Sequence, residues 1–312
     1  MVQLAYIFPG QASQYAGMGR DLRDNFAAAR EVFDEADDAL GFAVSQMCFA
    51  GTAEELQLTE NTQPAILTVS VAAYRAALAE GLPEPAFVAG HSLGEYSALV
   101  AAGALTLADA VRAVRLRGRY MQEAVPLGVG AMAAVMGADI ALLQEICAEA
   151  AENEVCSLAN INSANQIVIA GNAAAIDRAL VLLKERGVRK AIKLNVSAPF
   201  HCALMQPAQV RLANDLARLS FNDLRAPLIT NADAAAITDG ATARDALIRQ
   251  VSSPVRWLES VERLITSGVT TFVEIGPGKV LCGLLRQINR EARSLHIEDA
   301  ASLRATLEAL TV

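Results

Sequence analysis

The chain has 312 residues, of which 53% are hydrophobic and 19% are charged. These proportions are typical of a folded protein with a large core, and they exclude an intrinsically disordered chain. The formal net charge of −8 argues against a nucleic-acid-binding protein.

The first residues predict a strand rather than a targeting segment. Residues 3–8 are mostly apolar and no basic residue precedes them, whereas a signal peptide needs a basic start. The longest uncharged stretch, residues 155–176, is interrupted by several asparagines, so no membrane-spanning segment is predicted. The five cysteines are scattered without metal-ligand spacing. This pattern favours reduced thiols, a cytoplasmic protein and no metal site.

Helix and strand patterns alternate through the first third of the chain. Residues 21–40 and 63–80 have helical patterns, and the second helix is expected to open just before Pro64, at an allowed first-turn position. An apolar run over 85–89 predicts a strand, and residues 95–102 predict the next helix. This alternation is typical of a parallel sheet covered by helices.

The pattern changes in the middle of the chain. A further helix begins at Thr106, whose hydroxyl can cap it, and Pro126 then interrupts the chain. The elements that follow are strand 131–136, helix 140–151, strands 155–160 and 166–170, helix 174–187 and strand 190–196. Because the order β-α-β-β-α-β is ferredoxin-like, we expect residues 127–198 to form an inserted subdomain. Residues 1–126 and 199–312 would form the core around it.

Helices and strands resume in the last third. Helices are predicted over 204–219, 243–251, 255–267 and 301–310, and strands over 227–230, 271–275 and 294–297. The whole chain therefore reads as an α/β protein.

Gly90-His91-Ser92-Leu93-Gly94 lies between a predicted strand and a predicted helix. This G-x-S-x-G pattern in that context predicts a nucleophile elbow, a sharp turn that presents the serine hydroxyl near a helix N-terminus. The glycines are expected to take strained backbone angles and to let strand and helix pack closely. Backbone N–H groups at the turn can stabilise a developing oxyanion.

A serine needs a base, and the chain has only three histidines. His91 adjoins Ser92 and is badly placed to take its proton, so turn support is the better interpretation. His296 lies in a predicted strand and is interpreted as structural. His201 follows a strand, at a turn set by Pro199, and precedes a helix whose N-terminus favours the neutral imidazole. His201 is therefore the predicted base, with helix capping as the alternative. No third, acidic member is evident, and a backbone carbonyl can take its place.

Arg117 stands apart from the other arginines of its helix. Arg112, Arg115 and Arg119 cluster away from the apolar stripe, whereas Arg117 lies at its edge beside Met121. A guanidinium near the core needs an anionic partner. That partner is either a carboxylate of this protein or a carboxylate of a substrate, and periodicity does not choose between them.

Several ordered motifs now resemble those of one family, the malonyl-CoA:acyl-carrier-protein transacylases of dissociated bacterial fatty-acid synthesis. They are Phe8-Pro9-Gly10-Gln11, Thr62-Gln63-Pro64-Ala65, Gly90-His91-Ser92-Leu93-Gly94-Glu95-Tyr96, Arg117-Gly118 with Met121-Gln122, Ser197-Ala198-Pro199-Phe200-His201, Gln250 with Ser253-Pro254-Val255, and Glu274-Ile275-Gly276-Pro277-Gly278. The resemblance covers essentially the whole chain. It implies an α/β-hydrolase-like core with a parallel sheet and a ferredoxin-like (βαββαβ) subdomain.

The resemblance also implies an acyltransferase that carries malonyl from malonyl-CoA to acyl carrier protein by a ping-pong mechanism, without a cofactor. We expect the protein to be a monomer. Its implied site residues are as follows: Ser92 as nucleophile, His201 as base, Gln11 and the Leu93 N–H as oxyanion hole, Gln250 supporting His201 through its main-chain carbonyl, and Arg117, Phe200, Gln63 and Met121 as substrate-binding residues. Arg117 would pair with the malonyl carboxylate. Phe200 resembles the version of this segment that selects malonyl over branched acyl groups, a preference of only about 1–3 kcal/mol.

One position departs from the family pattern. Where the family usually has Gly-Gln-Gly-Ser-Gln, this chain has Gly10-Gln11-Ala12-Ser13-Gln14. If position 12 requires a positive φ, Ala12 is strained.

Docking of an acidic carrier protein on this acidic chain requires local basic patches. The candidates are Arg189, Lys190 and Lys193, and Arg286, Arg290 and Arg293. For any one of these residues, the alternative to a docking role is that it simply belongs to the solvated surface. Two other functions fit the elbow less well: a thioesterase- or lipase-like serine hydrolase, which has no need for Arg117, and a non-catalytic scaffold that binds carrier protein.

Overall fold

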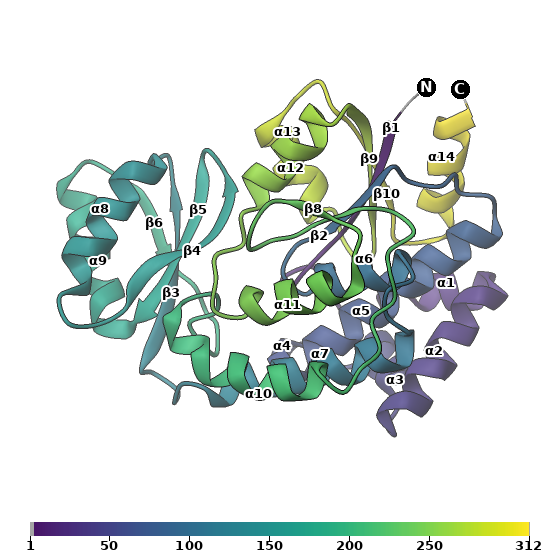
Figure 1. The fold of residues 1–312 in the computed structure, drawn as a ribbon, viewed down its shortest axis with the longest axis horizontal. Coiled ribbons are helices and arrows are strands. Elements are labelled where there is room, and N and C mark those ends of the chain that lie inside the picture. The colour runs from purple at the N-terminus through teal and green to yellow at the C-terminus, as the bar shows by residue number, and fades with distance from the viewer. Residues whose placement is uncertain (1–2, 312) are drawn as a thin grey trace.

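The computed structural model describes residues 3–311, and the larger part of the fold is built around a six-stranded, mostly parallel sheet (Figure 1). The strand order is β10-β9-β1-β2-β7-β8, and only β7 and β8 pair antiparallel. The strands are β1 (Gln3–Phe8), β2 (Phe87–Gly90), β7 (Leu228–Ile229), β8 (Ala236–Ile237), β9 (Val269–Ile275) and β10 (Arg293–Ile297). Strand β8 is not among the predicted elements.

Both faces of this sheet are covered by helices. Leu4, Tyr6 and Phe8 of β1 join the main hydrophobic cluster, while the alternate residues Ala5 and Ile7 join a second cluster on the other face. The first cluster draws on α5 (Thr59–Ala79), α6 (Gly94–Ala101) and α7 (Leu107–Glu123), and the second on α12 (Trp257–Thr266) and α13 (Val280–Ile288). Successive side chains of a strand point to opposite faces of the sheet. A strand of consecutive apolar residues therefore needs helices on both faces to bury them.

The helix predicted over 21–40 is in fact two helices, α1 (Arg20–Asn25) and α2 (Ala27–Leu40). Phe26 between them is extended, with φ −126° and ψ 125°. The apolar spacing continues across the break because both helices bury their stripes in the same cluster, so periodicity misses a single extended residue.

Some of the other helices lie close to their predicted ranges, and the rest were not predicted. Helix α7 is capped by Thr106, whose hydroxyl accepts a hydrogen bond from the Asp109 N–H at 3.0 Å, as predicted. The remaining helices of the core are α3 (Val44–Ala50), α4 (Ala53–Gln57), the 3-10 turn Ala203–Met205, α10 (Gln206–Leu216), α11 (Gly240–Gln250) and α14 (Ala300–Thr311). Helices α3, α4 and α13 are additional to the predicted elements, and all three are short; α4 begins with a capping box formed by Thr52 and Glu55, a signal that the sequence prediction did not use.

Helix α5 begins four residues before the predicted start, so Pro64 lies inside it. Proline cannot donate a hydrogen bond to the carbonyl four residues earlier. That carbonyl, of Glu60, instead accepts from Arg115 Nη1 of α7 at 3.1 Å. A Cβ atom at Gly118 would lie 2.6 Å from the Thr59 carbonyl oxygen, so glycine is needed where α7 meets α5. This close packing brings Arg117 beside Gln63.

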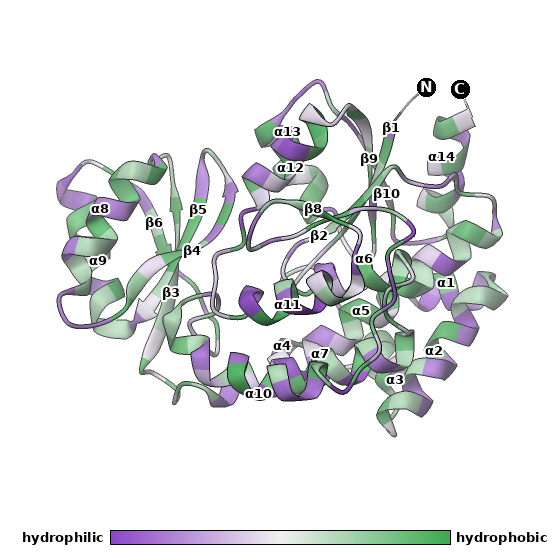
Figure 2. Cartoon of the chain, viewed as in Figure 1, coloured by the Kyte–Doolittle hydropathy of each residue, from purple (hydrophilic) through white to green (hydrophobic). Residues whose placement is uncertain are grey.

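The second sheet has four antiparallel strands in the order β4-β5-β3-β6, as in ferredoxin-like folds. Its elements are β3 (Gly130–Met136), α8 (Ile140–Ala151), β4 (Cys156–Ser163), β5 (Gln166–Asn172), α9 (Ala173–Glu185) and β6 (Lys190–Lys193). Helices α8 and α9 cover the outer face, and their outward sides are mainly hydrophilic (Figures 1 and 2). The predicted α/β-hydrolase-like core with a ferredoxin-like unit is confirmed. Strand β4 is longer than predicted and β6 is shorter.

The two sheets are joined next to the predicted nucleophile. Val255 pairs with β4, donating to the Ala159 carbonyl at 2.8 Å and accepting from the Ile161 N–H at 2.9 Å. His91 Nε2 lies 2.8 Å from Asn162 Oδ1 at the end of the same strand. Strand β4 therefore reaches the turn that carries Ser92.

Two classes of feature are absent from residues 3–311. None of the helices there is long and apolar enough to cross a membrane. In the same part of the chain, no three His, Cys, Asp or Glu side chains are grouped so that they could hold a metal ion.

Candidate active site

Ser92 lies in the turn between β2 and α6 and has a φ of +51°. This left-handed conformation is uncommon for a residue with a side chain. Gly90 and Gly94 do not share it: a Cβ at Gly90 would collide with the backbone of Gly94, and one at Gly94 would collide with Phe8. The expectation that the glycines take strained angles is therefore wrong. Close packing requires the glycines, and the serine itself carries the strain.

Two amide side chains hold the strained backbone of Ser92. Asn231 Oδ1 accepts from the Ser92 N–H at 2.6 Å, and Asn231 Nδ2 donates to the Gly90 carbonyl at 2.7 Å. Gln250 Nε2 donates to the Ser92 carbonyl at 2.9 Å. Both polar groups of the Ser92 backbone are thus satisfied, which stabilises the strained turn.

His201 lies beside the serine hydroxyl. Its Nε2 is 2.7 Å from Ser92 Oγ, and its Nδ1 is 3.0 Å from the Gln250 carbonyl oxygen. A carbonyl only accepts hydrogen bonds, so Nδ1 carries the proton and the Nε2 lone pair faces the hydroxyl. The residue is 4% exposed and has a φ of +60°. The geometry is that of a serine–histidine pair whose orienting group is a carbonyl instead of an acid.

Burial keeps this imidazole neutral. Desolvation, followed by the positive charge of Arg117, lowers the pKa of His201 to about 3. Both effects disfavour the imidazolium, so the ring can accept a proton throughout the physiological pH range.

We therefore predict that the rate of Ser92 acylation at saturating acyl-CoA is nearly constant between pH 5 and pH 8. An unshifted histidine would lose its base form below about pH 6.5 and slow the reaction tenfold per pH unit. Stopped-flow measurement of CoA release across this range tests the prediction. An acid limb centred near pH 6.5 would contradict the lowered pKa.

Arg117 is 1% exposed and points into the same site. Its Nη1 donates to Gln63 Oε1 at 2.8 Å, and its Nη2 donates to Gln250 Oε1 at 2.8 Å and to Ser92 Oγ at 3.1 Å. Its buried Nε has no partner, and no carboxylate of residues 3–311 forms an ion pair with the guanidinium. Burial lowers the pKa of Arg117, while Tyr96 and Glu95 oppose that shift. The sequence left two partners open for Arg117, a carboxylate of this protein or one of a substrate. Within residues 3–311, no carboxylate of the protein contacts the guanidinium.

The other predicted site residues surround this centre. Gln63 Nε2 lies 3.5 Å from Gln11 Oε1 and 3.9 Å from Met121 Sδ. Leu93 is the residue before α6, and its N–H has no recorded acceptor within residues 3–311. Phe200, adjacent to His201, is 8% exposed. The structure thus brings Gln11, Gln63 and Met121 together on the Arg117 side of the serine.

Ala12 has a φ of +79°, the strained conformation considered from the sequence. We predict that Ala12→Gly raises the free energy of unfolding by about 0.5–1 kcal/mol, because relief of the left-handed strain exceeds the added entropy of glycine in the unfolded chain. Chemical denaturation measures this change. Ala234, which also has a positive φ (+49°), offers a matched substitution away from Gln11. A loss of stability in Ala12→Gly would contradict the prediction.

Sequence reasoning missed two residues of the site, Glu95 and Asn231. Every residue of α6 is buried, so a carboxylate in that helix was a detectable signal, because charges are rarely buried without a role. Asn231 has no such signal, since an asparagine after a short strand is common in loops. His91 has the supporting role predicted for it, with its ring 5.6 Å from that of Trp257.

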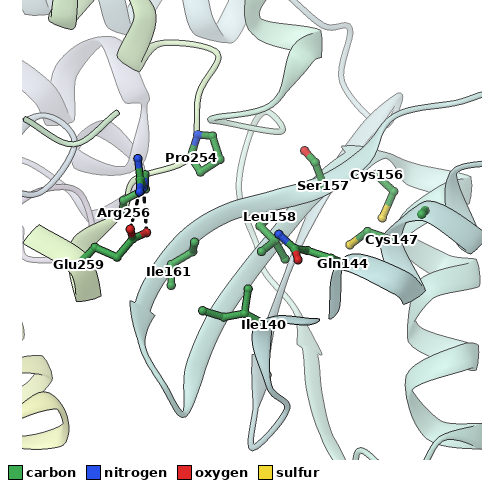
Figure 3. Close-up of a pocket in the computed structure, with 11 residues that line it drawn as sticks. Ile140, Gln144, Cys147, Cys156, Ser157, Leu158, Ile161, Pro254, Arg256 and Glu259 are labelled. Carbon is green, nitrogen blue, oxygen red and sulfur yellow. Dashed lines mark hydrogen bonds and ion pairs between the residues drawn. The ribbon is translucent and has the colours of Figure 1, made fainter. Parts of the chain in front are cut away.

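A cavity of about 550 Å³ lies elsewhere, between the ferredoxin-like unit and α12. Figure 3 shows its lining by Ile140, Leu158 and Ile161, with the Arg256–Glu259 ion pair at one side and Cys147 and Cys156 at the other. None of the predicted site residues lines this cavity, so it is separate from the Ser92 centre.

A serine on a strand–helix turn, a histidine within hydrogen-bond distance and a buried guanidinium together define an α/β protein built for nucleophilic acyl chemistry. The chain belongs to the acyl transferase domain family, which it matches over residues 5–304. The family resemblance found in the motifs is therefore confirmed.

Known relatives match over nearly the full length. The chain is 47% identical to the malonyl CoA-acyl carrier protein transacylase of Escherichia coli (strain K12), covering 99% of this chain and 100% of the relative. It is similar to the crystal structure of an acyl carrier protein S-malonyltransferase from Vibrio cholerae, with a TM-score of 0.95, 47% identity and coverage of 97% and 99%. It is also similar to a malonyl-transacylase solved in complex with its type II PKS acyl-carrier protein, with a TM-score of 0.96, 43% identity and coverage of 98% and 99%.

Proposed function

We propose that this protein transfers the malonyl group of malonyl-CoA to the phosphopantetheine thiol of acyl carrier protein, through a malonyl ester on Ser92. The names of its relatives support this reaction. The observation that carries it is a buried guanidinium 3.1 Å from the serine hydroxyl, with no carboxylate of the described chain in contact. A substrate with a free carboxylate supplies the missing anion.

In the first half-reaction, Ser92 Oγ attacks the thioester carbonyl while His201 Nε2 takes the hydroxyl proton. The tetrahedral oxyanion is stabilised by the Leu93 N–H and by Gln11, and each such donor is worth roughly 3–4 kcal/mol. Collapse of the intermediate breaks the C–S bond. His201 returns its proton to the departing CoA thiolate, and the malonyl ester remains on Ser92.

In the second half-reaction, the carrier-protein thiol attacks the ester. His201 accepts the thiol proton and passes it to Ser92 Oγ as the ester bond breaks. Arg117, held by two amide oxygens, keeps the malonyl carboxylate in one orientation, so that the ester faces the incoming thiol rather than water.

The remaining expectations belong to the same proposal. The carrier protein is acidic and docks on basic residues. The candidates Arg189, Lys190, Lys193, Arg286, Arg290 and Arg293 are all exposed, and Lys193 also pairs with Asp177 at 2.7 Å. The enzyme acts in the cytoplasm, in fatty-acid synthesis, without a cofactor.

Intact-mass spectrometry after incubation with malonyl-CoA tests the proposal. The chain should gain the mass of one malonyl group and lose it when phosphopantetheinylated carrier protein is added, and Ser92→Ala should gain nothing. Rapid CoA release without a thiol acceptor would show a hydrolase instead. Failure to form any acyl-enzyme would show a binding scaffold.

A further inference from the structure

Glu95 is an ionisable group at the site that the proposed reaction leaves unused. It is the second residue of α6 and has no exposed surface. Its Oε2 accepts from the Asn231 N–H and from Gln250 Nε2, both at 2.9 Å, while its buried Oε1 has no partner. A carboxylate that remains charged in such a place needs a nearby cation.

The cation is Arg117, and it is linked to Glu95 through the side-chain amide of Gln250. Gln250 donates from Nε2 to Glu95 and accepts at Oε1 from Arg117 Nη2 at 2.8 Å. No direct ion pair joins Glu95 and Arg117 within the described chain. Because a carboxylate only accepts, it fixes the Gln250 amide with its oxygen toward the guanidinium. One positive and one negative charge therefore lie at this site with a single amide between them.

A malonyl carboxylate at Arg117 would add a second negative charge beside the buried Arg117 and Glu95. Two carboxylates around one guanidinium repel, and one of them is then favoured in its neutral form. The malonyl carboxylate would contact Arg117 directly, whereas Glu95 reaches it only through Gln250. Glu95 is therefore the carboxylate that becomes neutral.

We propose that Glu95 is the internal counter-ion of Arg117 and takes up one proton from solvent when the malonyl carboxylate binds the guanidinium. This inference rests on the proposed function, since it requires that carboxylate at Arg117. Glu95 acts here as a positioning residue. When it is ionised it holds Gln250 and Arg117 in place, and when it is neutral it leaves the positive charge of the guanidinium to the substrate carboxylate.

The charged surroundings fit this exchange. Burial raises the pKa of Glu95 to about 7, hydrogen bonds from Gln250 and Asn231 and the charge of Arg117 oppose the rise, and Asp233 adds to it. Tyr96, on the same helix, has a pKa raised by burial and stays neutral. The pKa values of His91 and His201 are lowered. Among the groups that face the site, Glu95 is thus the one whose proton is exchangeable near neutral pH.

Calorimetry on Ser92→Ala, which binds without reacting, tests the proposal. Malonyl-CoA is titrated at pH 7.5 in buffers of different ionisation enthalpy, and the slope of observed against ionisation enthalpy counts protons. We expect uptake of roughly 0.5–1 proton per malonyl-CoA. Acetyl-CoA, which carries the same CoA but no free carboxylate, should give a slope near zero, as should malonyl-CoA with the double variant Ser92→Ala/Glu95→Gln.

The pH dependence of binding is the second readout. Because the malonyl complex prefers protonated Glu95, its dissociation constant should rise as pH increases above about 7, by up to tenfold per pH unit. The Glu95→Gln version keeps an acceptor for Asn231 and Gln250 but has no proton to exchange, so its dissociation constant should stay level from pH 6 to pH 8.5. If Glu95 had only a structural role, its replacement by glutamine would not change how the dissociation constant depends on pH.

The outcomes separate the two proposals. Arg117-dependent malonyl binding with a zero proton slope would overturn the role of Glu95 and leave the proposed function standing. If Ser92→Ala binds malonyl-CoA no better than acetyl-CoA, and Arg117→Ala changes nothing, the proposed function itself fails. If the Glu95→Gln variant folds poorly, the proton slope on Ser92→Ala still tests the proposal, because a slope near zero overturns the role of Glu95.

Discussion

Replacing His201 with alanine is expected to slow acylation of Ser92 by roughly 10⁴- to 10⁶-fold, the range for loss of a paired catalytic base. Its Nε2 lies 2.7 Å from the hydroxyl, and the other side chain bonded to that oxygen, Arg117, can only donate. Without the imidazole, no side chain of residues 3–311 that is bonded to the Ser92 hydroxyl can accept its proton. Rapid-quench measurement of the acyl-enzyme at saturating malonyl-CoA gives the rate.

His296→Ala is the matched control, because that half-buried histidine lies near Glu298 at the edge of the sheet and should leave acylation unchanged. His201→Gln keeps a similar volume and should be as slow as His201→Ala. A loss smaller than tenfold in both His201 variants would show that another group takes the serine proton.

Arg117→Ala should lower kcat/KM for malonyl transfer by an amount equivalent to about 2–5 kcal/mol, or roughly 30- to 5,000-fold. The guanidinium is fully buried and is held by the amide oxygens of Gln63 and Gln250, so its loss removes the only contact with the substrate carboxylate that we propose. Acetyl transfer should fall by less than tenfold. The comparison is made at pH 8, where His201 is neutral with or without the arginine.

Arg117→Lys keeps the charge but lacks the planar fork that reaches Gln63, Gln250 and Ser92 at once, so it should recover only part of the malonyl activity. Equal losses for malonyl and acetyl transfer would remove the carboxylate role and leave Arg117 as a structural support of the turn.

Local sequence patterns predicted much of the fold because they report which face of each element is buried. The strand over residues 3–8, the cap at Thr106 and the βαββαβ order all match the structure. The break at Phe26 does not match because the apolar spacing continues across it, and the early start of α5 does not match because it involves contacts with a distant helix. The carbonyl that Pro64 leaves free, for example, is bonded by Arg115, 55 residues further along than its own residue, Glu60.

By itself, the sequence determined the turn at Ser92, the choice of His201 among three histidines and the inward side of Arg117, because turn chemistry, flanking elements and helical period are local properties. The tertiary structure alone decided what surrounds them: which residue carries the strained φ, the two amides that hold the Ser92 backbone, and the carboxylate of Glu95 behind Gln250. Hydrogen bonds and charge interactions in a buried site depend on distances between segments more than 100 residues apart, and one-dimensional spacing does not contain those distances.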